Sequence, residues 1–210
     1  MPSFHAKYGI HRNANLRFSY ARAINRPSFF EIVPYSIINE DYKERNPDLK
    51  HTVADNIDLR YEFFPKSSEQ FMVACSIRIS RTIEYGLLNE GQDTYYKPMN
   101  FGDAKNLGME VDVMKYFNWF GIKANYTYTH SKVTTDKRIM EGSEVKSVRQ
   151  SRPLFGQAAH VANLSLLFKE TRHGWEGQVS ASYTGKRLSD ISNWYEDDIW
   201  EDATPSWMLR

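Results

Sequence analysis

The sequence predicts an all-β fold of antiparallel, up-and-down strands that form part of the wall of a transmembrane β-barrel, an incomplete one. Apolar and polar residues alternate with a period of two in segment after segment. Short turns alternate with long connections along the chain. Several predicted strands reach about ten residues, which at a tilt near 45° rise roughly 23 Å and match an apolar band of about 25 Å.

The first half of the chain contains alternating segments at 3–10, 15–22, 56–64 and 71–80. In the third of these, Ile57 and Leu59 fall on one face, whereas Asp58 and Arg60 fall on the other. Because side chains of a strand point alternately to its two faces, we expect each segment to be a strand with one apolar and one polar face.

The second half repeats the pattern at 106–113, 122–129, 162–168 and 175–186, and a further strand begins near Trp207. Ile122 and Tyr126 share a face, and Lys123 lies on the opposite face. No segment shows a convincing period of 3.6 residues, so the sequence predicts an all-β chain with about eight full strands and the start of one more.

The connections differ systematically in length. Short turns fall at 11–14, 65–68, 118–121 and 171–174, and long segments fall at about 25–53, 85–104, 135–157 and 188–203. Strict alternation places all short turns at one edge of the sheet and all long loops at the other, which is typical of outer-membrane barrels. Aromatic residues gather near the short turns, as in an interfacial girdle, although aromatics are also common in strands generally.

Composition excludes several classes of function. The 210 residues carry a formal net charge of +1, so nothing indicates a nucleic acid as partner. The single cysteine, Cys75, excludes an internal disulfide framework and a cysteine-cluster metal site. The N-terminal sequence lacks the features of a signal peptide, and no apolar run of about eighteen residues predicts a membrane helix.

No catalytic signature is present in the sequence. The motifs G-x-S-x-G, H-E-x-x-H, the P-loop and G-x-G-x-x-G are all missing, so we expect neither an enzyme nor a bound cofactor. The acidic run at 195–202 has ligands suited to a hard cation. A solvated loop is the preferred interpretation of that run.

Charged residues on the polar faces of the strands are candidates for lining a barrel lumen. They are Asp58, Arg60, Glu62, Arg78, Glu110, Asp112 and Lys123. One interpretation is that they pair only with neighbouring strands, each cross-strand pair contributing under about 1 kcal/mol.

Four stretches in this order resemble the barrel of TonB-dependent outer-membrane receptors. They are LRFSYARAINRPSFFEIVP (16–34), NPDLKHTVADNIDLRYEF (46–63), NFGDAKNLGMEVD (100–112) and RPLFGQAAHVANLSLLF (152–168). Arg45 stands where the family usually has glycine. The resemblance covers most of the chain and identifies residues 1–210 as the C-terminal part of such a barrel domain, with the plug domain and the final strands absent.

The resemblance implies a location in the bacterial outer membrane and the import of a scarce nutrient, such as an iron–siderophore complex. Its partners would be outer-membrane lipid, the plug domain of the full-length receptor, TonB through the missing N-terminal part, and the small nutrient ligand. The resemblance also implies that the plug fills the lumen and forms salt bridges with the charged residues of the polar faces. The alternative from another class is a soluble all-β ligand-binding module with its loops clustered at one end. The loop residues that we expect to bind ligand are Arg26, Tyr35, Tyr42, Tyr96, Arg152 and Trp194. They combine stacking area with positive charge, but the same residues could instead only hold the loops folded.

Overall fold

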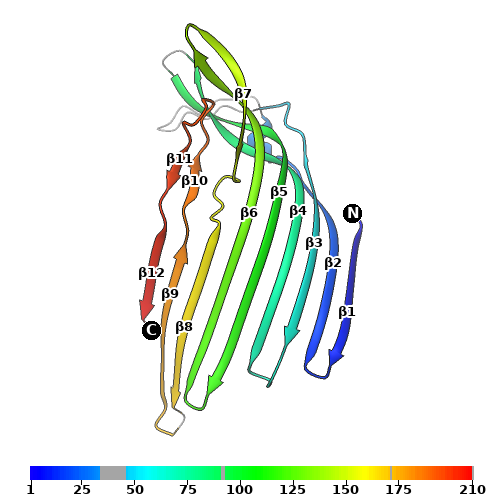
Figure 1. The fold of residues 1–210 in the computed structure, drawn as a ribbon, viewed down its shortest axis with the longest axis vertical. Helices are drawn as coiled ribbons and strands as arrows, with labels where there is room; N and C mark the ends of the chain where they lie inside the picture. The colour runs from blue at the N-terminus through cyan, green and yellow to red at the C-terminus, as the bar shows by residue number, and fades with distance from the viewer. Residues whose placement is uncertain (34–45, 91–92, 171, 210) are drawn as a thin grey trace.

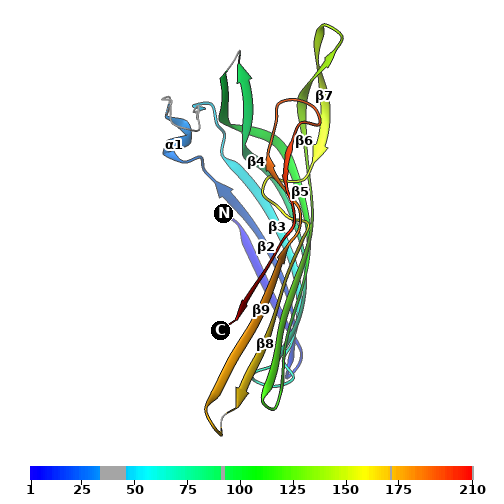
Figure 2. The same ribbon diagram turned by 90° about the vertical axis from the view of Figure 1, so that its left-hand side faces the viewer.

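The computed structural model describes residues 1–33, 46–90, 93–170 and 172–209. The chain forms one large antiparallel sheet, which is tall, twisted and curved (Figures 1 and 2). Its strands follow the order β1-β2-β3-β4-β5-β6-β8-β9-β12, so neighbours in the sheet are neighbours in the sequence apart from β7, β10 and β11. The predicted up-and-down architecture is confirmed.

The strands of the first half of the sheet are long and regular. They are β1 (Ser3–His11), β2 (Ala14–Asn25), β3 (Thr52–Phe63), β4 (Gln70–Glu90) and β5 (Asp93–Phe117). The alternating segments predicted in this half lie within strands, except that the segment 56–64 extends one residue beyond the end of β3. The alternation therefore located the strands, although β4 and β5 extend well beyond it.

The second half contains β6 (Phe120–Glu141), β7 (Glu144–Arg152), β8 (His160–Glu170), β9 (Trp175–Thr184), β10 (Arg187–Asp190), β11 (Ile199–Glu201) and β12 (Thr204–Leu209). The lower part of β6 pairs with β8, and its upper part pairs with β7. β10 and β11 form a separate small sheet. β1 and β12 each pair with one neighbour among the described residues and form the two edges of the large sheet.

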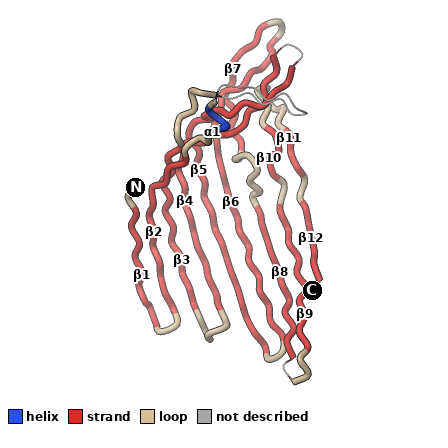
Figure 3. Tube along the Cα trace, turned by 180° about the vertical axis from the view of Figure 1, so that it is seen from behind, coloured by secondary structure: helices blue, strands red, loops and turns tan. Residues whose placement is uncertain are grey.

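Short turns and long connections lie at opposite ends of the sheet, as predicted (Figure 3). The short turns join β1 to β2, β3 to β4, β5 to β6, and β8 to β9. In the β5–β6 turn, Asn118 takes a φ of 50°, a left-handed conformation that asparagine tolerates better than most residues. We call the two ends of the sheet the turn end and the loop end.

Two of the long segments predicted as loops are in fact strands. Residues 85–104 lie mostly within the β4–β5 hairpin, and residues 135–157 lie mostly within the β6–β7 hairpin. The β6–β7 loop starts at Gly142, whose φ of 65° suits a two-residue hairpin turn beginning with glycine. In the β6–β7 hairpin the prediction failed because most residues on both faces are polar, so the apolar signal that marks a half-buried strand is missing.

The all-β prediction is confirmed, and the described residues add one short helical turn. α1 (Phe29–Ile32) is a single turn in which the Ser28 N–H donates a hydrogen bond of 2.6 Å to the Glu31 carboxylate. The sequence Ser-x-x-Glu is the capping-box signature that could have predicted it. No helix in the described part of the chain is long and apolar enough to cross a membrane.

Tight packing is concentrated at the loop end. Val133 and Leu188 are fully buried, and Ala104, Ala158 and Ile191 are nearly so. Most of the sheet has no such core, because many large apolar side chains remain exposed, including Leu59 at 48%, Ile77 at 45% and Leu107 at 50%. An exposed apolar surface of this extent marks an interaction with a partner or a membrane.

Candidate functional site: the two faces of the sheet and its loop end

Strand register keeps the two kinds of side chain on opposite faces across the whole sheet. Ile57 lies opposite Ile77, which lies opposite Leu107 on the next strand. On the other face, Arg60 lies opposite Ala74, which lies opposite Glu110. Since a one-residue slip would exchange the faces, this matched register is strong evidence that the two surfaces serve different environments.

All the candidate lumen residues lie on the polar face. The register places Asp58, Arg60 and Glu62 of β3 on the same face of the sheet as Arg78 of β4, Glu110 and Asp112 of β5, and Lys123 of β6. The sequence thus predicted correctly that these residues share a face, because its period of two is preserved from strand to strand.

Part of the polar face is hollowed. A hollow of about 510 Å³ is lined from β2 to β6 and includes the side chains of Asp58, Arg60, Arg78 and Glu110. Small residues open the space between these charges, since Ala74 lies between Arg60 and Glu110 in one row. Gly108 lies beside Ser76 in the next row, so closely that a Cβ at Gly108 would lie 2.6 Å from the Ser76 Oγ.

Some charges on this face have partners on neighbouring strands. Arg17 Nε donates a hydrogen bond of 2.8 Å to the buried Glu62 carboxylate. Arg78 Nε donates to the Asn56 amide oxygen at 2.6 Å. Asp58 accepts from Ser19 Oγ at 3.3 Å. The cross-strand pairing considered from the sequence therefore accounts for part of the set.

Other charges have no such partner. Among the described residues, Arg60, Glu110 and Lys123 form no side-chain hydrogen bond or ion pair. Arg60 and Glu110 line the same hollow, with the β4 strand between them. A surface that presents separate positive and negative charges can bind a partner carrying complementary charges.

Of the residues predicted to bind ligand, the structure describes the side chains of Arg26, Arg152 and Trp194. Tyr35 and Tyr42 lie outside the described residues, and only the backbone of Tyr96 is described, within β5. Arg26 is exposed after β2. Arg152 belongs to β7, not to a loop, and is 4% exposed, with its Nη1 donating to the Pro153 carbonyl at 3.1 Å.

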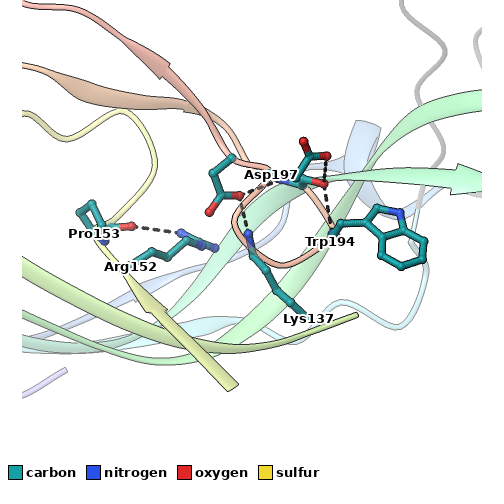
Figure 4. A network of polar contacts seen from close by, with 7 residues as sticks. Lys137, Arg152, Pro153, Trp194 and Asp197 are labelled. Atoms are coloured by element: carbon teal, nitrogen blue, oxygen red, sulfur yellow. Dashed lines mark hydrogen bonds and ion pairs between the residues drawn. The ribbon is translucent and has the colours of Figure 1, made fainter. Parts of the chain in front are cut away.

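Trp194 belongs to a polar network at the loop end that the sequence did not predict (Figure 4). Lys137 Nζ donates to the Asp198 carboxylate, which also accepts from the Ser192 N–H at 2.9 Å. Ser192 Oγ donates to Asp197 at 3.0 Å and accepts from the Trp194 N–H at 3.1 Å. The network fastens the connection between β10 and β11 to the β6–β7 hairpin.

Most residues of the acidic run are exposed, as the preferred interpretation expects, but Asp198 is not. The Asp198 side chain is 5% exposed and paired with Lys137. Among the described residues, no group of three or more histidine, cysteine, aspartate or glutamate side chains is placed to hold a metal ion. Asp198 therefore contributes to loop packing, a role that alternation and spacing cannot show.

Together, the open antiparallel sheet, its exposed apolar face and its continuous polar face define a wall segment of an outer-membrane barrel. The chain belongs to the outer membrane protein beta-barrel family, which it matches over residues 1–196. It is accordingly a protein of the bacterial outer membrane. No curated protein sequence matches it.

Solved structures with the same fold are outer-membrane receptors and a transporter. A mutant of the ferric enterobactin receptor PfeA from Pseudomonas aeruginosa, in complex with enterobactin, has a TM-score of 0.65 at 15% identity, over 99% of this chain and 32% of that one. The copper transporter OprC has a TM-score of 0.70 at 13% identity, over 99% and 30%. The siderophore receptor PirA from Acinetobacter baumannii has a TM-score of 0.62 at 12% identity, over 99% and 34%.

The chain thus spans about a third of the length of each of these structures. At such identities the likeness concerns the fold. It confirms, at that level, the resemblance to outer-membrane receptors that the sequence motifs carry.

Proposed function

We propose that the chain forms part of the barrel wall of a TonB-dependent receptor that imports a scarce nutrient such as an iron–siderophore complex. The observation that carries the proposal is the register, which keeps an exposed apolar face and a charged face apart over the full width of the sheet. A soluble binding module would have to cover the apolar face with a second layer. No second layer packs on the sheet among the described residues.

In this proposal, the apolar face contacts lipid. Leu59, Ile77 and Met109 lie on it with 40% or more of each residue exposed. In a bilayer, hydrocarbon surrounds these side chains in place of water. Each side chain moved out of water stabilises the protein by about 1.5–3 kcal/mol. Tight turns at one end and long connections at the other fit the usual asymmetry of outer-membrane barrels.

The charged face, in the same proposal, contacts a plug domain. The charges of Arg60, Glu110 and Lys123, which lack partners among the described residues, would pair with complementary groups on the plug. Such pairs hold a plug in register without sealing it permanently, because salt bridges in a hydrated lumen are individually weak, at about 0–1 kcal/mol. TonB would act on the same protein through a part outside this chain.

Two kinds of structural relative suggest which class of nutrient is imported. PfeA is a receptor for ferric enterobactin and OprC is a copper transporter, so the fold serves more than one cargo. We favour a bulky siderophore complex, because the aromatic and cationic residues that the sequence places at the loop end suit stacking against a large anionic ligand.

Uptake by whole cells tests the function. Cells lacking the gene for the whole protein, grown without added iron, are compared with the same cells carrying it on a plasmid. We expect accumulation of radioactive iron from ferric enterobactin only in the complemented cells, and only when TonB is present. Copper uptake in its place would replace the siderophore part of the proposal. Uptake of neither cargo, with the protein assembled in the membrane, would contradict import of these cargoes.

A further inference from the structure

Two lysines face each other on the apolar side of the sheet near the loop end. Lys105 of β5 lies directly opposite Lys132 of β6 in the antiparallel register. Both are exposed and share the face of Leu107 and Met109, which follow Lys105 at every second position. Neither lysine has a hydrogen-bond or ion-pair partner among the described residues.

The position of this pair along the strands is defined by the aromatic turn end. Lys105 lies 12 residues from Phe117 along β5, and Lys132 lies 12 residues from Phe120 along β6. At about 3.3 Å per residue and a tilt near 45°, these 12 residues rise roughly 28 Å. Since the apolar band of such barrels is about 25 Å tall, the two lysines lie just beyond its far margin, at the level of lipid headgroups.

Like charges placed directly opposite each other in a sheet destabilise it. Another lysine on the same strand and the same face as Lys105 does have an anionic partner. Lys115, at the turn end of β5, donates a hydrogen bond of 2.7 Å to the carboxylate of Glu69. Asp103 lies two residues from Lys105 on the same strand and face, yet Lys105 has no ion pair among the described residues. The loop-end pair therefore has room for an anion that the described residues do not supply.

Two histidines extend the same patch. His130 lies two residues before Lys132 on the same face of β6. His160 of β8 lies opposite Tyr128 of β6. The His160 Nδ1 lies 2.8 Å from the Tyr126 hydroxyl, and its ring is tilted against Tyr128 at 5.2 Å between centroids. Aromatic rings of this kind favour the boundary between hydrocarbon and headgroups.

We propose that Lys105 and Lys132 bind the phosphate of an anionic lipid headgroup in the leaflet at the loop end. The proposal rests on the assignment of the apolar face to lipid. A lipid is the occupant, not free phosphate, because Leu107 and Met109 continue directly from the pair as an exposed apolar track for acyl chains, 50% and 44% exposed. The site would tie the loop end of β5 and β6 to the membrane surface.

The whole protein, reconstituted in phosphatidylcholine nanodiscs with a minor share of phosphatidylglycerol, tests the site. Native mass spectrometry or spin-labelled lipids measure how far the protein enriches phosphatidylglycerol over phosphatidylcholine. We expect enrichment by the wild type, and a loss of about fivefold for each of Lys105→Gln and Lys132→Gln. The matched control is Lys123→Gln, which removes the same charge from the same strand on the polar face.

Three results would overturn the proposal. The first is full enrichment in the double variant, and the second is an equal loss in Lys123→Gln. The third is displacement of phosphatidylglycerol by inorganic phosphate at the same concentration, which would show a plain anion site. A second measurement distinguishes failure of the headgroup site from failure of the assignment of the apolar face to lipid. It uses an environment-sensitive fluorophore on Cys75, which is exposed on the apolar face. Quenching by brominated acyl chains without enrichment refutes the headgroup site alone, whereas absence of quenching refutes both.

Discussion

Lys137 Nζ lies 2.5 Å from the Asp198 carboxylate, although the two residues are 61 positions apart and their side chains are only 2% and 5% exposed. Burial lowers the pKa of Lys137, because desolvation penalises the ammonium form, and the hydrogen bond to Asp198 opposes this effect. Backbone bonds accompany the pair. The Arg138 N–H donates to the Asn193 carbonyl, and the Tyr195 N–H donates to the Arg138 carbonyl. This contact fixes the β10–β11 connection to β6.

We expect Asp198→Asn to release that connection, because it leaves a buried ammonium without its anion. Breaking a buried pair from one side costs about 3–5 kcal/mol, whereas replacing both partners with apolar residues costs far less. Hydrogen exchange at the amides of Arg138 and Tyr195 measures the local opening free energy. The control is Glu141→Gln, which breaks an exposed pair with Lys146 on the same hairpin and should cost under about 1 kcal/mol. Equal effects of the two single changes would contradict a structural role for the buried pair.

The β3–β4 turn should depend on pH through Glu69. The hydrogen bond from Lys115 lowers the pKa of this carboxyl below its ordinary value of 4.5. The stabilisation is therefore complete above the ordinary value and is lost as the pH falls through the lowered one, because protonation removes the anion that both Lys66 and Lys115 contact. We expect exchange of the Glu69 amide, which donates to the Lys66 carbonyl, to accelerate over this acidic range. Glu69→Gln should remove the pH dependence, and a dependence that survives the change would assign it to another group.

The sheet could be predicted from the sequence, whereas the loop end could not. Alternation is a local property, so Ile57, Asp58, Leu59 and Arg60 reveal a two-faced strand without knowledge of any partner. The Lys137–Asp198 contact joins residues from distant hairpins, and no spacing rule relates them. Alternation also continues in the β6–β7 hairpin, but there a buried lysine stands where a strand pattern would lead one to expect an apolar residue. Local pattern predicts local structure, while contacts made by long connections require the folded chain.

Arginine substitutions should distinguish the two faces in the whole protein refolded in lipid vesicles. Leu59→Arg, Ile77→Arg or Val111→Arg should lower the free energy of unfolding by about 2–4 kcal/mol, because each places a charge on the lipid face near the midplane of the bilayer. Thr127→Arg, Ser76→Arg or Ser180→Arg should be tolerated far better, since these positions lie on the polar face.

Urea titration followed by intrinsic fluorescence measures both sets of variants. The best comparison is Val111→Arg with Thr127→Arg. Val111 lies opposite Tyr126 on the apolar face, and Thr127, the next residue on β6, lies opposite Glu110 on the polar face. The two changes therefore share their depth in the sheet. Equal penalties would refute the assignment of the apolar face to lipid.

Trp194 remains the best described candidate for ligand contact at the loop end. Its backbone N–H is held by Ser192 Oγ, whereas its indole points away from Lys137 (Figure 4). We expect Trp194→Ala in the whole protein to weaken binding of ferric enterobactin about tenfold, a typical loss for one well-placed aromatic ring. The control is Trp175→Ala at the turn end, where the ring is 70% exposed and far along the strands from the loops. Equilibrium binding to whole cells, with surface expression measured in parallel, separates affinity from assembly. If Trp194→Ala leaves affinity unchanged and only reduces surface expression, the ring serves the folding of the loops, and ligand is held by residues elsewhere in the protein.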